Sequence, residues 1–231
     1  MIARTQTQKG LIAAGTVFVT VAAALDFLSS QYIAITFPNR VPVDDLLFRL
    51  TPYLSWTQYL SDAAAIIGPI LLGWYIFNGR EKYLPRALFS IGLGYLMRAS
   101  MIILTPLGGP LGNGALYGFI PLVQNGQIPS GHTMLAMLCY LFVDRREAPR
   151  IKALLLLSVG VEILSLILSR GHYGIDIAVG LLVAYVAYHE SPRLIGCISS
   201  ETYETPTKGV SWGRNLGSGA GGTREMGSLR T

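Results

Sequence analysis

The chain has 231 residues, of which 51% are hydrophobic and only 13% are charged. Soluble domains carry about 25% charged residues, so the composition excludes a water-exposed globular domain and indicates an integral membrane protein. The formal net charge of +5 could indicate a nucleic-acid partner. The positions of the basic residues argue against that partner, because these residues collect in short loops between apolar segments.

Six apolar segments are candidates for transmembrane helices, which need about 20 mostly apolar residues. They lie at residues 11–35, 57–77, 85–106, 130–144, 151–169 and 173–191. We therefore predict an all-α integral membrane protein whose six transmembrane helices form one bundle over residues 1–195. Residues 196–231 are polar and include GSGAGG, so we expect a flexible tail without a catalytic role.

The first segment has an alternative interpretation as a cleaved signal peptide. MIARTQTQKGLIAAGTVFVTVAAALD combines basic residues, an apolar core and small residues, which is typical of such peptides. The apolar character resumes after Asp26 with FLSSQYIAITF. The whole segment is then long enough to span a bilayer, and we favour a retained helix.

Basic residues in the short loops predict the orientation, since Lys and Arg favour the cytoplasmic side. One side carries Arg4, Lys9, Arg80, Lys82, Arg86, Arg145, Arg146, Arg150, Lys152 and Arg193, and the other carries only Arg40, Arg49 and Arg170. We expect both termini in the cytoplasm and the loops near 36–56, 107–129 and 169–173 outside. A short chain of this kind suits a bacterial inner membrane, with the outer loops facing the periplasm or exterior.

Two histidines fall at this outer face, each at the start of an apolar segment. His132 lies in PSGHT (129–133) and His172 lies in SRGHYGID (169–176). His172 and Asp176 are four residues apart, so on a helix they would share one face. The carboxylate could accept the N–H of one ring nitrogen and leave the other nitrogen as a nucleophile.

Groups suited to phosphate flank both histidines. Arg170 offers a fork of donors that matches a tetrahedral oxyanion. Ser130 can cap a helix that follows Pro129, and Gly131 lets a ligand approach the backbone at a helix N-terminus, where anions bind. With His132 as general acid and base, these residues predict phosphoester chemistry through a phosphohistidine intermediate.

A metal site is the alternative for this group of residues. Two histidines and one aspartate could hold a metal ion. Arg170 next to them would repel a cation, so we expect neither a metal nor another cofactor.

Further charged side chains lie within the apolar segments, where a lone charge is unfavourable. We predict that Arg98 and Glu162 form a pair or share a polar cavity beneath the site, and Arg98 is also a candidate phosphate contact. Asp26 and Asp62 lie toward the outer halves of their segments. Their carboxylates would suit a cationic headgroup such as choline or ethanolamine.

The outer loop at residues 106–128 carries no charge, is rich in Gly and Pro, and is still apolar. Two interpretations are open. The loop can pack over the bundle, or it can lie at the level of the lipid headgroups and shape an access route for a lipid substrate.

PSGHT and SRGHYGID resemble two signature motifs of the type 2 phosphatidic acid phosphatase superfamily. The second is similar to the pattern S-R-x-H-Y-x-x-D of its sphingomyelin-synthase-like branch. PVDDLLFRLTP (42–52) resembles the P-L-P-D motif of that branch, and RASMIILTPL (98–107) resembles its R-x-x-T-type motif. Asp44 stands where the family has a proline, and the proline of PSGHT is closer to the phosphatase branch.

The resemblance implies that His172 is the nucleophile, Asp176 its partner and His132 the general acid and base. Asp45, in the P-L-P-D-like motif, is a candidate headgroup or support residue, as are Asp26, Asp62 and Glu162. We predict a phosphotransferase that moves a phospho-headgroup from a phospholipid to a ceramide-like lipid alcohol, both drawn from the bilayer.

Two other functions remain open. A lipid phosphate phosphatase would use the same site with water as the acceptor. A non-enzymatic transporter is less expected, because the sequence has no internal repeat of the kind common in transporters. No feature of the sequence indicates the oligomeric state.

Overall fold

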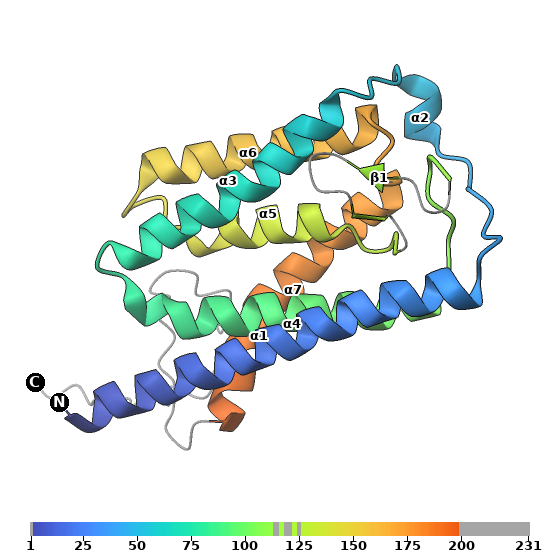
Figure 1. Ribbon diagram of the computed structural model, residues 1–231. Coiled ribbons are helices and arrows are strands. Elements are labelled where there is room, and N and C mark those ends of the chain that lie inside the picture. The colour runs from blue at the N-terminus through green and yellow to red at the C-terminus, as the bar shows by residue number, and fades with distance from the viewer. Residues whose placement is uncertain (1, 113–115, 118–121, 124–125, 199–231) are drawn as a thin grey trace, which may run out of the picture.

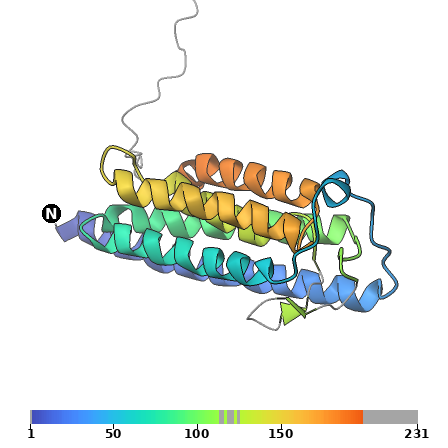
Figure 2. The same ribbon diagram turned by 90° about the horizontal axis from the view of Figure 1, so that it is seen from above.

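The computed structural model describes residues 2–112, 116–117, 122–123 and 126–198. In this part of the chain six long helices form a bundle (Figures 1 and 2). They are α1 (Ile2–Thr36), α3 (Thr57–Phe77), α4 (Leu84–Leu104), α5 (Gly131–Phe142), α6 (Pro149–Leu168) and α7 (Gly174–Ile198). Each helix overlaps one of the six predicted segments, so the hydropathy pattern located all of them.

Shorter elements connect the long helices. α2 (Leu46–Leu50) precedes α3, and a 3-10 turn, η1 (Glu81–Tyr83), leads into α4. Between α4 and α5, β1 (Leu116–Tyr117) pairs antiparallel with β2 (Leu122–Val123). Within the described residues the all-α prediction is therefore confirmed apart from this two-residue pairing.

Four spans are long and apolar enough to cross a membrane, namely Gln8–Thr36, Thr57–Phe77, Glu81–Leu104 and Pro149–Leu168. α5 is apolar but has only 12 residues. Such a helix reaches about 18 Å, short of the roughly 30 Å hydrocarbon core. Large apolar side chains are exposed on the bundle, including Val17, Ile70, Trp74, Leu157 and Leu182. The chain is a membrane protein, whereas six spans, cytoplasmic termini and an outward-facing site stay predictions.

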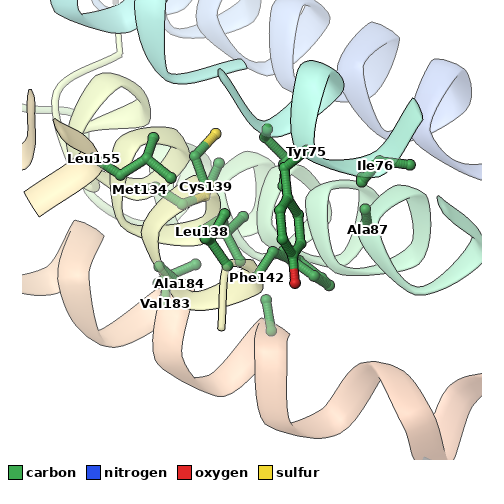
Figure 3. Packing of buried hydrophobic residues seen from close by; sticks show 13 residues of the cluster. Tyr75, Ile76, Ala87, Met134, Leu138, Cys139, Phe142, Leu155, Val183 and Ala184 are labelled. Atoms are coloured by element: carbon green, nitrogen blue, oxygen red, sulfur yellow. The ribbon is translucent and has the colours of Figure 1, made fainter. Parts of the chain in front are cut away.

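α5 lies at the centre of the bundle and packs against α3, α4, α6 and α7. Its Met134, Leu138 and Cys139 are fully buried. The core around them contains Phe142 of α5 itself and apolar side chains from every neighbouring helix (Figure 3), among them Leu72, Tyr75, Ile76, Ala87, Leu155, Val183 and Ala184. This surround of helices fixes the start of α5, and with it His132, relative to the other helices.

α1 packs along α4 on the side of the bundle away from α6 (Figure 1). The Phe18 and Phe89 rings stack with centroids 5.6 Å apart. A Cβ added at Gly92 would lie 2.5 Å from the Phe18 ring, so glycine lets the two helices approach closely at this point.

Two predicted segments are described only in part. Residues 196–198 of the predicted tail are helical, since α7 extends to Ile198, and residues 199–231 lie outside the described residues. Much of the loop at 106–128 also lies outside them. Near its beginning, a Cβ added at Gly108 would lie 2.8 Å from the backbone of Arg40 and Val41. Gly108 therefore packs against the segment at Arg40 and Val41. Both interpretations of the whole loop stay predictions.

Candidate active site

The start of α5 is held by a side-chain cap and by a link to α7. The Ser130 side chain accepts a hydrogen bond from the Thr133 backbone N–H at 3.3 Å, which confirms the predicted cap. The Ser130 backbone N–H donates to the Asp176 carbonyl at 3.0 Å. His132 thus stands in the first turn of α5, and 34% of its side chain is exposed.

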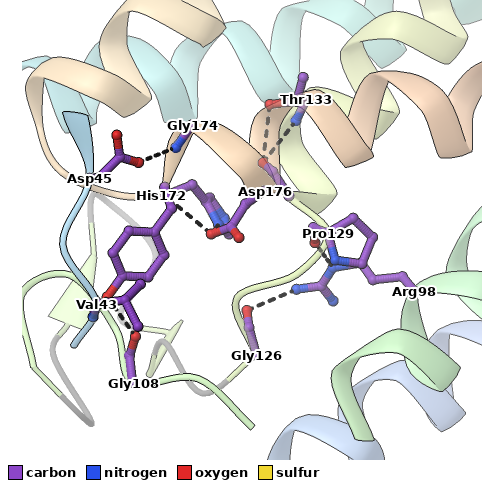
Figure 4. Close-up of polar contacts among 12 residues, drawn as sticks. Val43, Asp45, Arg98, Gly108, Gly126, Pro129, Thr133, His172, Gly174 and Asp176 are labelled. Carbon is purple, nitrogen blue, oxygen red and sulfur yellow. Dashed lines mark hydrogen bonds and ion pairs between the residues drawn. The ribbon is translucent and has the colours of Figure 1, made fainter. Parts of the chain in front are cut away.

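The predicted contact between His172 and Asp176 is present at the start of α7 (Figure 4). His172 Nδ1 lies 3.2 Å from Asp176 Oδ2, which also accepts the Tyr173 backbone N–H at 3.0 Å. α7 begins only at Gly174, so His172 precedes the helix and Asp176 reaches back to it from the first turn. The His172 side chain is 6% exposed and that of Asp176 is fully buried. A ring that donates its Nδ1 proton to Asp176 keeps its Nε2 lone pair available.

The two histidines face one another across the interface of α5 and α7. Their ring centroids are 6.4 Å apart, with 59° between the ring planes. A glycine permits this approach, because a Cβ added at Gly180 would lie 2.8 Å from the Ser130 carbonyl oxygen. The structure therefore joins the two histidine motifs, which lie about 40 residues apart in the sequence, into one site.

Asp45 contacts the site from the segment between α1 and α3. Its Oδ1 accepts the Leu47 N–H at 2.8 Å and so caps α2, and its Oδ2 accepts the Gly174 N–H at 2.6 Å. The second bond reaches the first residue of α7, directly after the His172 loop. This position is compatible with the predicted support role.

Tyr173 is a neighbour that sequence analysis did not single out. It is buried, and its hydroxyl donates to the Gly108 carbonyl at 2.9 Å and accepts the Val43 N–H at 3.1 Å. It ties the His172 loop to the segments that contain Val43 and Gly108. Its place beside the motif histidine was the available signal, but its partners are 65 and 130 residues away in sequence and no local pattern identifies them.

The predicted Arg98–Glu162 pair is wrong. Arg98 forms an ion pair with Asp26 of α1 and donates from Nε to the Pro129 carbonyl at 2.9 Å. Glu162 is buried between α3 and α6, where it accepts a hydrogen bond from the Ser61 hydroxyl at 2.6 Å. The two residues were paired on their similar depth, and depth gives no information on the direction in which a side chain points. The alternative of a shared polar cavity stays a prediction.

Of the remaining predicted residues, Asp62 lies near His132 and Arg170 contacts the aromatic rings of Phe48 and Tyr53. Asp62 of α3 is buried, with Oδ1 4.0 Å from His132 Nε2. Arg170 has a positive φ of 54°. Its guanidinium donates to the Phe48 carbonyl at 3.2 Å and lies over the Phe48 and Tyr53 rings. The phosphate-binding roles of Arg170, Ser130, Gly131 and Arg98 stay predictions.

Residues 127–191 match the family model described as PAP2 superfamily C-terminal. The match includes both histidine motifs and covers α5, α6 and most of α7. Phosphatidylcholine:ceramide cholinephosphotransferase 1 of Caenorhabditis elegans is 26% identical over 208 residues, covering 73% of this chain and 44% of the relative. The chain thus spans less than half the length of that relative. Together these matches confirm the resemblance to the type 2 phosphatidic acid phosphatase superfamily and its sphingomyelin-synthase-like branch.

Proposed function

We propose that the protein is a membrane-embedded lipid phosphotransferase that carries a phospho-headgroup on His172. One observation carries the proposal. Asp176 orients His172, and His132 faces it from the start of α5 with ring centroids 6.4 Å apart. Two rings opposed in this way suit a phosphoryl group between them, with a nucleophile on one side and a proton donor on the other.

In the first half-reaction His172 Nε2 attacks the phosphorus of a phospholipid. An N–P bond forms, the P–O bond to diacylglycerol breaks, and His132 gives its proton to the departing oxygen. Asp176 stabilises the positive charge that develops on the His172 ring. The product is a phosphohistidine that carries the headgroup, with diacylglycerol released into the bilayer.

In the second half-reaction His132 takes the proton of an acceptor hydroxyl. The hydroxyl oxygen attacks the phosphorus, an O–P bond forms and the N–P bond to His172 breaks. With a ceramide-like alcohol as acceptor, the product is a sphingophospholipid. Ceramide appears in the name of the C. elegans relative, and the alignment supports the same class of acceptor for this chain.

Binding of the phosphate oxygens is assigned to the start of α5 and to Arg170. The backbone N–H of Gly131 belongs to a helix N-terminus, where anions are favoured, and Ser130 caps that terminus. Asp62 is the carboxylate placed to attract a cationic headgroup, because it is buried 4.0 Å from His132. Glu162 accepts a hydrogen bond from Ser61, the residue before Asp62, and is assigned a supporting role. Following the distribution of Lys and Arg, we propose that the site faces the exterior of a bacterial inner membrane, with both termini in the cytoplasm.

The alternative is a lipid phosphate phosphatase in which water accepts the phosphoryl group. The same three residues would act, and the proline at 129 is the observation that favours this branch. Purified protein in detergent should be incubated with headgroup-labelled phosphatidylcholine, with and without ceramide, beside His172→Ala. Label in a new lipid only when ceramide is present supports the transferase. Water-soluble label regardless of ceramide supports hydrolysis. Equal signals from wild type and His172→Ala refute the transferase, and equal phosphate release from phosphatidic acid by the two proteins refutes the phosphatase.

A further inference from the structure

Arg98 is committed to protein partners on all three of its nitrogens, and Figure 4 shows the bonds to Pro129 and Gly126. Nε donates to the Pro129 carbonyl at 2.9 Å, Nη2 donates to the Gly126 carbonyl at 3.3 Å, and Nη1 pairs with Asp26. Only 13% of the side chain is exposed. This arrangement fixes the guanidinium between α1, α4 and the segment that leads into α5.

The two carbonyls that Arg98 binds belong to the segment before α5, outside the helix. Pro129 is buried and Gly126 is half-buried, and buried carbonyls outside regular structure need a donor from elsewhere. Pro129 directly precedes the helix cap Ser130, and His132 follows two residues later. The guanidinium also lies against the first residue of α5, since a Cβ at Gly131 would be 3.2 Å from Arg98 Nε. Arg98 therefore contacts the backbone on both sides of the cap, within two residues of His132.

Asp26 completes the arrangement from α1. A buried guanidinium without a counter-charge is strongly unfavourable within a membrane protein, and Asp26 supplies that charge across the α1–α4 interface. α1 packs along α4, so this ion pair is a route by which α1 affects the site.

We propose that Asp26 and Arg98 are a positioning pair that holds His132 against the leaving-group oxygen. This inference rests on the proposed function and assigns Arg98 a role different from that of a phosphate clamp. A clamp acts on every phosphoester equally, because the phosphate is the same in all of them. A pair that positions the general acid matters only when the departing oxygen needs a proton.

The leaving group provides the test. Diacylglycerol is a poor leaving group and requires protonation, whereas p-nitrophenolate leaves without it. The first half-reaction should be timed for phosphatidylcholine and for p-nitrophenyl phosphocholine, in a single turnover. The variants are Arg98→Met, Arg98→Lys and Asp26→Asn. His132→Ala is the reference for loss of the acid, and Arg193→Met, at the far end of α7, is the matched arginine control.

General acid catalysis contributes about 10²–10⁴-fold, and His132→Ala should lose that much on phosphatidylcholine and far less on the aryl ester. Arg98→Met should also lose more rate on phosphatidylcholine than on the aryl ester, by a factor of at least about ten. This factor is smaller than the full contribution of general acid catalysis, because His132 is still present. Arg98→Lys should resemble Arg98→Met, because an ammonium group lacks the planar fork that reaches both carbonyls. Asp26→Asn should lie between these variants and wild type.

The ratio of the two rates does not depend on how much of the protein is folded. A purely structural role would lower the rates on both substrates by the same factor, and so would a phosphate clamp. If Arg98→Met and Asp26→Asn each lose as much on the aryl ester as on phosphatidylcholine, the inference is overturned. If Arg98→Met cannot be purified in a folded state, the same ratio of rates on the two substrates is measured in Asp26→Asn and Arg98→Lys. A wild-type protein that turns over neither ester would instead refute the proposed function, and the positioning role with it.

Exchanging the charges gives a second, independent readout. The double variant Asp26→Arg/Arg98→Asp restores an ion pair but removes the donors to Pro129 and Gly126. Recovery of thermal stability without recovery of the rate on phosphatidylcholine is the expected result. Recovery of both would show that the pair only locks α1 to α4.

Discussion

Gly180 lies where α7 crosses the start of α5, and replacing it with alanine should separate the two histidines. The added Cβ would lie 2.8 Å from the Ser130 carbonyl oxygen, whereas ordinary contacts begin at 3.4 Å. The obstacle is backbone and cannot rotate away. The same Cβ would also approach the Thr133 side chain at 3.4 Å. The helices must therefore move apart by several tenths of an ångström.

The size of the effect follows from this displacement. Overpacking a well-packed interface costs about 1–3 kcal/mol, so Gly180→Ala should lower the midpoint of thermal unfolding in detergent. A misplacement of about 1 Å can reduce a rate by about 10²-fold. A shift of roughly half that size between His132 and His172 should then lower the turnover of phosphatidylcholine on the order of tenfold.

Gly160→Ala on α6 is the matched control, because a Cβ there meets nothing within 4 Å. It makes the same chemical change within a helix, and we expect unchanged activity and equal or slightly higher stability. Both variants should be assayed for turnover and unfolding side by side. Wild-type turnover in Gly180→Ala would refute the claim that the close α5–α7 contact sets the geometry of the site.

Three further predictions concern acidic residues. Asp176→Asn should lower turnover on the order of 10³–10⁴-fold with little change in stability, by analogy with loss of the orienting aspartate of a hydrolytic triad; kinetics and thermal unfolding of the purified variant check both. Asp45→Ala removes the acceptor of the Gly174 N–H and the α2 cap, so it should cost about 1–2 kcal/mol. Asp44→Ala, which loses only an exposed ion pair, should cost less than about 1 kcal/mol in the same unfolding measurement. Hydrogen bonds from Arg80 and then Tyr75 hold the pKa of Glu147 below its usual range. The stability from Glu147 is thus present above the ordinary glutamate pKa and lost as pH falls toward the lowered value, and unfolding of Glu147→Gln should depend less on pH in that acidic window.

The helices were predictable because each is a continuous apolar run, and such runs carry their own signal. The contact between His172 and Asp176 was also predictable, since it depends on a spacing of four residues. The spacing argument applies to a helix that contains both residues, yet α7 begins at Gly174. The spacing predicted the right contact because the carboxylate in the first turn reaches back to the preceding loop.

Long-range partners were not predictable from a single sequence. Arg98 was assigned to Glu162 because both are charged and similarly deep, whereas its partner is Asp26 on α1. The packing of the helices determines which neighbouring helix a charged side chain faces, and the hydropathy pattern does not contain this information. The bond from Gly174 to Asp45 spans 129 residues and is fixed in the same way by the packing of the outer loops.

The most direct test of the central claim is to look for the covalent intermediate. Wild-type protein is incubated with choline-labelled phosphatidylcholine in the absence of an acceptor lipid and quenched in alkali, in which phosphohistidine survives. The labelled peptides are then mapped by mass spectrometry. We predict phosphocholine on His172, with no adduct in His172→Ala and with loss of the adduct when ceramide is added. An adduct on another residue, or turnover by His172→Ala equal to that of wild type, would contradict the account.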